Sequence, residues 1–224
     1  LGNRQVTPDS LGPRVVDGLS MNRHLRTEPG RRNGTYLYTA EKAGRTVHPV
    51  LSGIHPGVMA QTGMETAEIV RGVVRESRPD LVIAGDALAA RNVHRLASPI
   101  QLTDTGIHPG SGVGNHRRGM TRENLGVPVI AIGVPTVVGA AAIVHGTVNA
   151  LVRTLTASKE GSRYGEYIRE LDSDSQYELI RELLEPEFGA MFVTPQDMDE
   201  RICKLSAAIA EGIRRAVERL GGER

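Results

Sequence analysis

The chain has little cysteine and almost no net charge, and each shortage excludes a class of protein. The single cysteine, Cys203, cannot form an internal disulfide bond, so a disulfide-stabilised fold is excluded and a reducing compartment is expected. Cys203 lies within an amphipathic pattern, where we expect it to pack rather than to react. The 27 Lys+Arg nearly balance the 26 Asp+Glu, so overall charge indicates neither a nucleic-acid nor a membrane partner.

Short metal-binding and nucleophile motifs are also missing. The histidines show no paired spacing such as His-x-x-x-His and no Cys/His cluster, which disfavours a zinc enzyme, although ligands can converge from distant positions. Ser111 is not part of a Gly-x-Ser-x-Gly turn, which disfavours a serine triad. We therefore expect neither a metal nor another cofactor.

One long stretch without charge, residues 126–152, raises the question of a membrane span. Pro128 and Pro135 interrupt its first part, and Gly133 and Gly139 lie nearby. A buried strand, a turn and an Ala-rich buried helix explain the stretch better than a span does.

Apolar residues alternate between helical and strand periods along a chain long enough for one domain, residues 1–224. We expect strands over 47–54, 80–86, 100–103 and 128–132, and helices over 11–19, after the capping-box spacing of 62–65, from about 140, and over 195–220 behind a Thr194 cap. Polar loops are expected within 158–176. This order predicts an α/β fold with three layers, in which helices cover both faces of a mostly parallel sheet.

The last expected helix carries a regular apolar stripe. Its members are Met198, Ile202, Leu205, Ile209, Ile213, Val217 and Leu220. The stripe fits core packing and an oligomer interface equally well. At the other end, Leu1-Gly2-Asn3 reads as the tail of a strand followed by a turn, so we expect a preceding segment that includes a first strand.

Three aspartates are expected at carboxyl ends of strands, where open α/β sheets bind ligands: Asp9, Asp86 and Asp104. Asp86 follows an almost wholly apolar strand, and a charge there is costly unless it is paired or used. Asp9 precedes a helix, so it could equally serve as an N-cap. Asp104 precedes Thr105-Gly106, where a turn-forming role is plausible.

Asp9 and Asp86 could act together. Two close carboxylates cannot both ionise easily, which raises the pKa of one and leaves an acid beside a base. Such a pair can direct water onto a peptide carbonyl. We hypothesise that Asp9 is ionised and that Asp86 holds the proton, as members of one coupled system.

The glycine-rich stretch 106–115 could support the site or bind substrate. It contains His108, Gly110, Ser111 and Gly112, but it lacks the full dinucleotide fingerprint. A specificity loop and a merely tight connection remain open. The following basic residues, 116–118, could meet acidic groups on a substrate or form an exposed basic turn.

Several ordered motifs resemble the germination (spore) protease family. They are Leu-Gly-Asn-x-x-Val-Thr-Pro-Asp-x-Leu-Gly-Pro at 1–13, Pro-Gly-Val-Met-x-x-Thr-Gly-x-Glu-Thr at 56–66, Asp-Ala-Leu-Ala-x-Arg at 86–91, Asp-Thr-Gly-Ile-His-Pro-Gly-Ser-Gly-Val-Gly-Asn at 104–115, Ile-Gly-Val-Pro-Thr-Val-Val at 132–138, and Val-Thr-Pro at 193–195. Each motif alone is modest evidence, whereas the ordered set is specific and covers nearly the whole chain.

The resemblance implies an endopeptidase that degrades small acid-soluble spore proteins during germination, within the spore core. It implies an atypical aspartic protease, made as a zymogen and assembled as a homotetramer, whose essential residues correspond to Asp9 and Asp86. The expected missing segment would then hold a propeptide and the first strand. The family is distantly similar to hydrogenase maturation peptidases, which bind nickel, but Thr103-Asp104 stands where those carry a histidine.

Two alternatives remain. One is a metal-dependent peptidase of the hydrogenase-maturation type. The other is a catalytically silent protein that uses the glycine-rich loop to bind peptide or phosphate.

Overall fold

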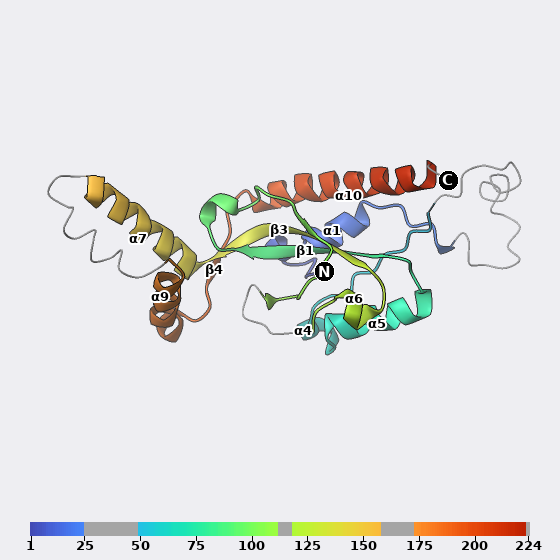
Figure 1. The fold of residues 1–224 in the computed structure, drawn as a ribbon, viewed down its shortest axis with the longest axis horizontal. Coiled ribbons are helices and arrows are strands. Elements are labelled where there is room, and N and C mark those ends of the chain that lie inside the picture. The colour runs from blue at the N-terminus through green and yellow to red at the C-terminus, as the bar shows by residue number, and fades with distance from the viewer. Residues whose placement is uncertain (25–48, 112–117, 158–172, 223–224) are drawn as a thin grey trace, which may run out of the picture.

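A computed structural model describes residues 1–24, 49–111, 118–157 and 173–222 of the chain (Figure 1). In chain order the elements are the 3₁₀ turn η1 (Thr7–Asp9), α1 (Leu11–Asp17), α4 (Met59–Thr62), α5 (Thr66–Ser77), β1 (Val82–Ala90), the 3₁₀ turn η2 (Val93–Arg95), β2 (Gln101–Thr103), α6 (Arg122–Leu125), β3 (Val129–Gly139), α7 (Ala140–Ala157), α9 (Ser173–Phe188), β4 (Phe192–Val193) and α10 (Met198–Gly222). The predicted α/β class is confirmed.

The sheet is built around β3. Strand β1 pairs with it in parallel from Val82 to Ala90, while β2 and β4 pair with it antiparallel over three and two residues. Most paired residues are therefore parallel, as predicted. Nearly every residue of β3 is buried, because helices lie on both sides of this strand.

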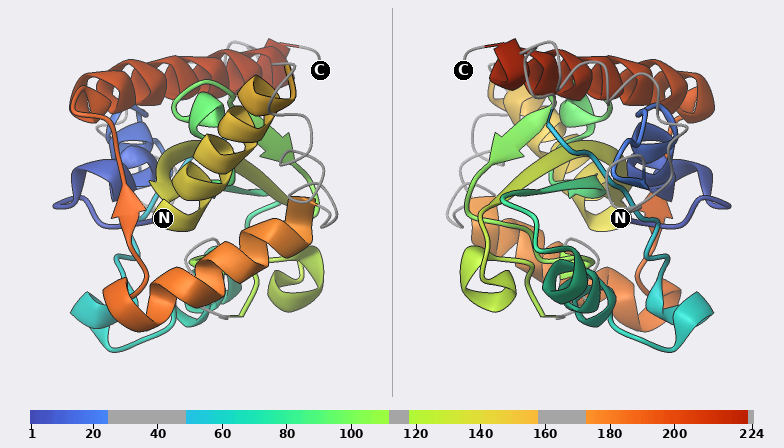
Figure 2. Two further views of the ribbon diagram at one scale, coloured as in Figure 1. Left: turned by 90° about the vertical axis from the view of Figure 1, so that its left-hand side faces the viewer. Right: turned by 90° about the vertical axis from the view of Figure 1, so that its right-hand side faces the viewer.

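Helices cover both faces of the sheet, which confirms the three-layer prediction. One face carries α1 and α10, and the other carries α5 and α6 (Figures 1 and 2). Leu11 of α1 and Ile202 of α10 pack with Val134 of β3 on the first face. Val70 of α5 and Leu125 of α6 pack on the second face with Val129, among other residues.

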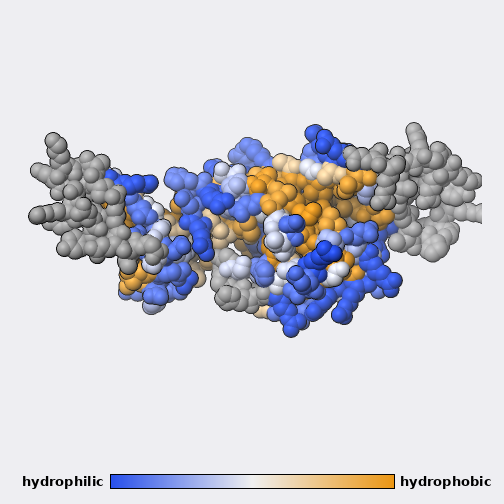
Figure 3. Space-filling view, viewed as in Figure 1, coloured by the Kyte–Doolittle hydropathy of each residue, from blue (hydrophilic) through white to orange (hydrophobic). Residues whose placement is uncertain are grey.

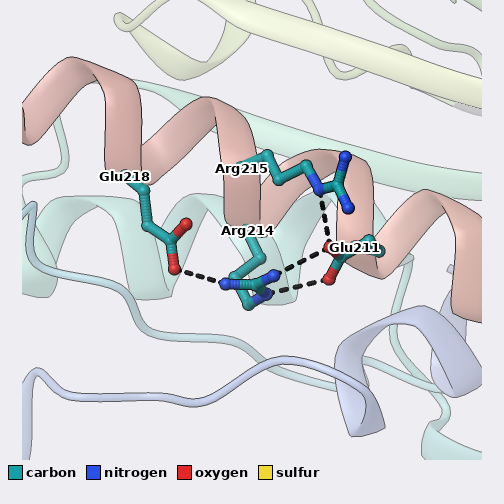
Figure 4. A network of polar contacts seen from close by, with 4 residues as sticks. All are labelled: Glu211, Arg214, Arg215 and Glu218. Carbon is teal, nitrogen blue, oxygen red and sulfur yellow. Dashed lines mark hydrogen bonds and ion pairs between the residues drawn. The ribbon is translucent and has the colours of Figure 1, made fainter.

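Helix α10 places most of its apolar stripe in the core. Met198 and Ile202 are almost completely buried, and Ile209 and Ile213 also pack against α1. Its outer face carries a cluster of ion pairs, in which Glu211 accepts hydrogen bonds from Arg214 and Arg215 and Arg214 also binds Glu218 (Figure 4). Leu220, at the end of the stripe, is exposed. Core packing therefore explains the stripe except at its last residue.

Several local predictions are wrong. Residues 49–54 form no strand, and 47–48 lie outside the described residues. Cys203 is exposed rather than packed. Thr194 does not cap α10; its hydroxyl donates to the Thr136 carbonyl at 2.9 Å and ties the chain to β3.

Another error concerns the end of the expected polar loop. Residues 173–176 are not a loop but form the first turn of α9. Residues 158–172 of that loop lie outside the described residues.

The capping box predicted over 62–65 lies one helical turn later, over 65–68. Glu65 is the N-cap of α5, and its amide donates to the Glu68 carboxylate at 3.1 Å.

The outer edge of β1 borders a groove. The cavity measures about 1350 Å³, and its lining includes Leu81 and Ile83 of β1, Val73 of α5, and Ile213 of α10. Figure 3 shows its apolar surface between α10 and α5. Within the described ranges, no helix is long and apolar enough to cross a membrane.

Candidate active site

Asp86 lies in the middle of β1, not at its end as predicted. The strand continues to Ala90, and Asp86 pairs in register with Gly133 of β3. Side chains alternate along a strand, so Asp86 shares the face of Ala84, which packs in the α5 cluster. The residue is only 7% exposed, so a carboxylate has been placed where the sheet is otherwise apolar.

Asp9 reaches the same region from the turn before α1. Its Oδ2 accepts a hydrogen bond from the Asn3 amide at 2.7 Å. The N-cap of α1 is Ser10, and no side chain caps this helix. The structure therefore excludes the capping alternative for Asp9, whose carboxylate is used by the preceding loop instead.

Two glycines allow the backbone to pack this closely. Gly2 has φ +97°, and a Cβ there would lie 2.8 Å from the Asp9 carboxylate, so the loop can wrap over Asp9 only with glycine at this position. A Cβ on Gly12 would lie 2.4 Å from the carbonyl oxygen of Gly85. Helix α1 consequently rests directly on the β1 backbone beside Asp86.

The two carboxylates interact electrostatically. Burial raises the pKa of Asp86 to about 6, and repulsion by Asp9 adds to this shift. Burial also raises the pKa of Asp9, against the hydrogen bond from the Asn3 amide, which lowers it. The Leu1 backbone nitrogen lies 2.5 Å from the Gly85 carbonyl oxygen, so residue 1 lies beside β1 next to Asp86. Asp86 is the more buried of the two aspartates, and Asp9 is close enough for its charge to repel that of Asp86.

Side chains that the sequence analysis missed hold Asp9 in place. Asn3 Oδ1 accepts from the Gln5 amide at 3.0 Å and from Gln61 Nε2 at 3.1 Å, which links the Asp9 loop to α4. Ser10 is fully buried, and its hydroxyl donates to Thr7 while accepting from Arg14. Asn3 stands within the first motif, but nothing in the sequence signals Gln61, because its partner is 58 residues away.

Replacing Gln61 with leucine should alter the titration of Asp9. Loss of the bond to Asn3 loosens the loop that donates to Asp9, so the ionised carboxylate loses support and its pKa rises. We expect the acidic limb of the pH–rate profile to move upward by a few tenths of a unit, with kcat lower by about threefold. Gln5→Ala is the matched control, since only the Gln5 backbone binds Asn3. Equal effects of the two substitutions would contradict this positioning role.

The other predicted residues lie apart from the aspartates. Thr103 pairs with Ala131 of β3, whereas Asp86 pairs with Gly133, and β2 and β1 lie on opposite sides of β3. Asp104, which is exposed, is therefore about 10 Å across the sheet and about 10 Å along it from Asp86. This placement does not bring Asp104 into the pair.

The glycine-rich stretch begins on the α6 side of the sheet. The His108 ring lies against Gly119, where an added Cβ would meet its Nε2 at 2.5 Å. Gly110 has φ +77°, and Ser111 is exposed, with its amide bonded to the His108 carbonyl. Gly112 lies outside the described residues. In the part of the chain that the structure covers, no group of three His, Cys, Asp or Glu residues could hold a metal ion.

Comparisons with known proteins point to one family. The family model described as germination protease matches residues 1–165. Proteins named germination protease are similar over 97% of this chain: 46% identical in Caldanaerobacter subterraneus subsp. tengcongensis, 42% in Clostridium acetobutylicum and 39% in Bacillus velezensis. The chain spans 64% of the length of each of these relatives.

Proposed function

Because this chain belongs to the germination protease family, we propose that it forms the catalytic part of an endopeptidase in which Asp9 and Asp86 activate water. One observation supports this most directly: two carboxylates from distant parts of the chain interact in a buried site, and burial raises the pKa of both. Such an arrangement is costly for folding and is typical of a functional site.

The two aspartates suit different roles, with Asp9 as the base and Asp86 as the protonated acid. The Asn3 amide favours the ionised form of Asp9, whereas the apolar surroundings of Asp86 favour its protonated form. In the proposed step, Asp9 removes a proton from water as the water oxygen bonds to the peptide carbonyl carbon, and Asp86 donates a hydrogen bond to the developing oxyanion. Asp9 then passes its proton to the leaving amine as the carbon–nitrogen bond breaks.

The substrate and assembly follow from the family resemblance. We propose small acid-soluble spore proteins as substrate, cleaved in the spore core during germination, by a homotetramer that is made as a zymogen. Loss of activity on chelation, restored by one metal, would favour the metal-dependent alternative instead. Binding of spore proteins without cleavage, unchanged by substitution of either aspartate, would favour the silent binding protein.

Purified chain mixed with a small acid-soluble spore protein should produce discrete fragments. The rate of cleavage should show a bell-shaped dependence on pH. The rate rises as Asp9 ionises and falls as Asp86 loses its proton, at an apparent pKa near 6. Initial rates from pH 3 to pH 9, measured by mass spectrometry of fragments, test this. A profile with no limb altered by substitution of either aspartate would refute the mechanism.

A further inference from the structure

A second, basic cavity lies on the same face of the sheet as Asp86. It measures about 230 Å³ and lies between α5 and the segment that leads into α6. Its lining consists of Ala67, Arg71, Arg118, Gly119, Asn124 and Leu125. Neither of the two predicted catalytic aspartates lines it.

The two arginines of this cavity have no anionic partner. Across the residues that the structure describes, no ion pair or hydrogen bond involves the guanidinium of Arg71 or Arg118. On α5, the Glu68 carboxylate belongs to the helix's own capping box, where it accepts from the Glu65 amide, and Glu76 lies five residues beyond Arg71. Two free guanidinium groups at one cavity form a strong site for a carboxylate, because each offers several donors in a fixed plane.

The rest of the cavity suits a single side chain rather than a large ligand. Ala67 and Leu125 are buried and give it apolar walls, against which methylene groups can pack. The Asn124 side-chain amide donates to the Gly119 carbonyl at 2.7 Å and fixes the rim. The volume is small for a nucleic-acid strand but sufficient for one glutamate or aspartate side chain.

Its position links the cavity to the aspartate pair. Helix α5 begins beside α4, whose Gln61 contacts Asn3 of the Asp9 loop, and Arg71 lies five residues into α5, about 7.5 Å along its axis. Leu1, whose backbone nitrogen lies against the Gly85 carbonyl beside Asp86, packs against the cluster that contains Ala67 and Leu125.

We propose that Arg71 and Arg118 form a subsite for an acidic side chain of the polypeptide substrate, a few residues from the bond that is cut. This proposal rests on the proposed endopeptidase function. The subsite supplies specificity and substrate orientation, whereas Asp9 and Asp86 perform the chemistry.

The test uses fluorescein-labelled peptides derived from a small acid-soluble spore protein, in which each Asp or Glu is replaced in turn by Asn or Gln. Binding is measured by anisotropy with the Asp86→Asn chain, which prevents turnover, and cleavage is measured with the unaltered catalytic pair. At one acidic position, the amide peptide should bind about tenfold more weakly. The Arg71→Gln/Arg118→Gln chain should bind the acidic and amide peptides equally. Arg75→Gln and Arg122→Gln, which change neighbouring arginines outside the cavity, should retain the tenfold preference.

The outcomes separate the subsite from the catalytic proposal. Acid-dependent binding through the two arginines without any cleavage would support the subsite and reject the endopeptidase. Cleavage without any acid preference, or the same loss in the control variants, would overturn the subsite alone. Inorganic phosphate that binds through these arginines, while acidic and amide peptides still bind alike, would also overturn it by indicating a free-anion site.

Discussion

The Asp86→Asn chain is expected to lose at least about 10³-fold in kcat/KM for spore-protein cleavage while it remains folded. Asparagine has nearly the shape of aspartate, and its oxygen can still accept from the Ala87 amide, which now donates to Asp86 at 3.0 Å. Its amide is a weaker hydrogen-bond donor than a protonated carboxyl group, so it stabilises the developing oxyanion less. Asp9→Asn should lose a similar factor, because the pair acts as a unit.

The same substitution should change how stability depends on pH. Burial raises the pKa of Asp86 from 3.8 to about 6, so the folded protein favours the protonated carboxyl more than the unfolded chain does. Its contribution to stability is therefore fully present below about pH 4 and is lost as pH rises through about 6. Between pH 4 and pH 7.5, Asp86→Asn should gain on the order of 3 kcal/mol relative to the unaltered chain.

Urea denaturation at both pH values and cleavage assays of the same preparations check these two results together. Ser111→Ala is the control, because Ser111 is exposed and lies outside the pair, and its activity should change little. Substantial cleavage by Asp86→Asn would remove this residue from the mechanism. Loss of activity without the gain in stability would show that Asp86 ionises freely in the folded protein.

The layers of the fold could be predicted from the sequence because they depend on local periodicity. The apolar run of β3 and the helical spacing of Leu11 and Val15 carry their own signal, and both elements begin within one residue of where expected. However, β3 continues to Gly139, where a turn after residue 132 was predicted. The strand expected over 47–54 failed because short apolar runs with no regular neighbour in the sheet form extended loops equally well. The length of β1 was underestimated because Asp86 was read as its end, whereas pairing with β3 carries the strand four residues further.

The site could be predicted only in part, because local periodicity does not reveal which distant side chains the fold brings together. Asp86 was identifiable because a charge within an apolar run is costly, and Asp9 because of the motifs around it. Which group binds the Asp9 carboxylate could not be inferred, since Asn3 acts through its backbone amide and Gln61 comes from a distant turn. The placement of Arg71 and Arg118 beside one cavity could not be predicted from the sequence either, because it depends on how α5 packs against the segment before α6.

Gly12→Ala should be the most damaging single-methyl change near the site. The new Cβ would lie 2.4 Å from the Gly85 carbonyl oxygen and equally close to the Leu1 backbone. Real Cβ atoms do not approach backbone this closely, so α1 must move away from β1. We expect a loss of about 3 kcal/mol in the free energy of unfolding, which corresponds to a melting temperature lower by about 6–12 °C.

The displacement should also separate the aspartates. Asp9 lies three residues before Gly12, in the 3₁₀ turn that leads into α1, so a shift of α1 carries its carboxylate away from Asp86. The pKa of Asp86 should then fall, because repulsion by Asp9 is one of the contributions that raise it, and the alkaline limb of the pH–rate profile should move downward.

Gly72→Ala is the matched control, since Gly72 lies in α5 with no atom within 4 Å of an added Cβ. This variant should gain about 0.5–1 kcal/mol in the free energy of unfolding. Calorimetry of both variants tests the expected stability changes, and their pH–rate profiles test the expected shift of the alkaline limb. If Gly12→Ala proves as stable and active as Gly72→Ala, then contact of α1 with β1 does not determine where Asp9 lies.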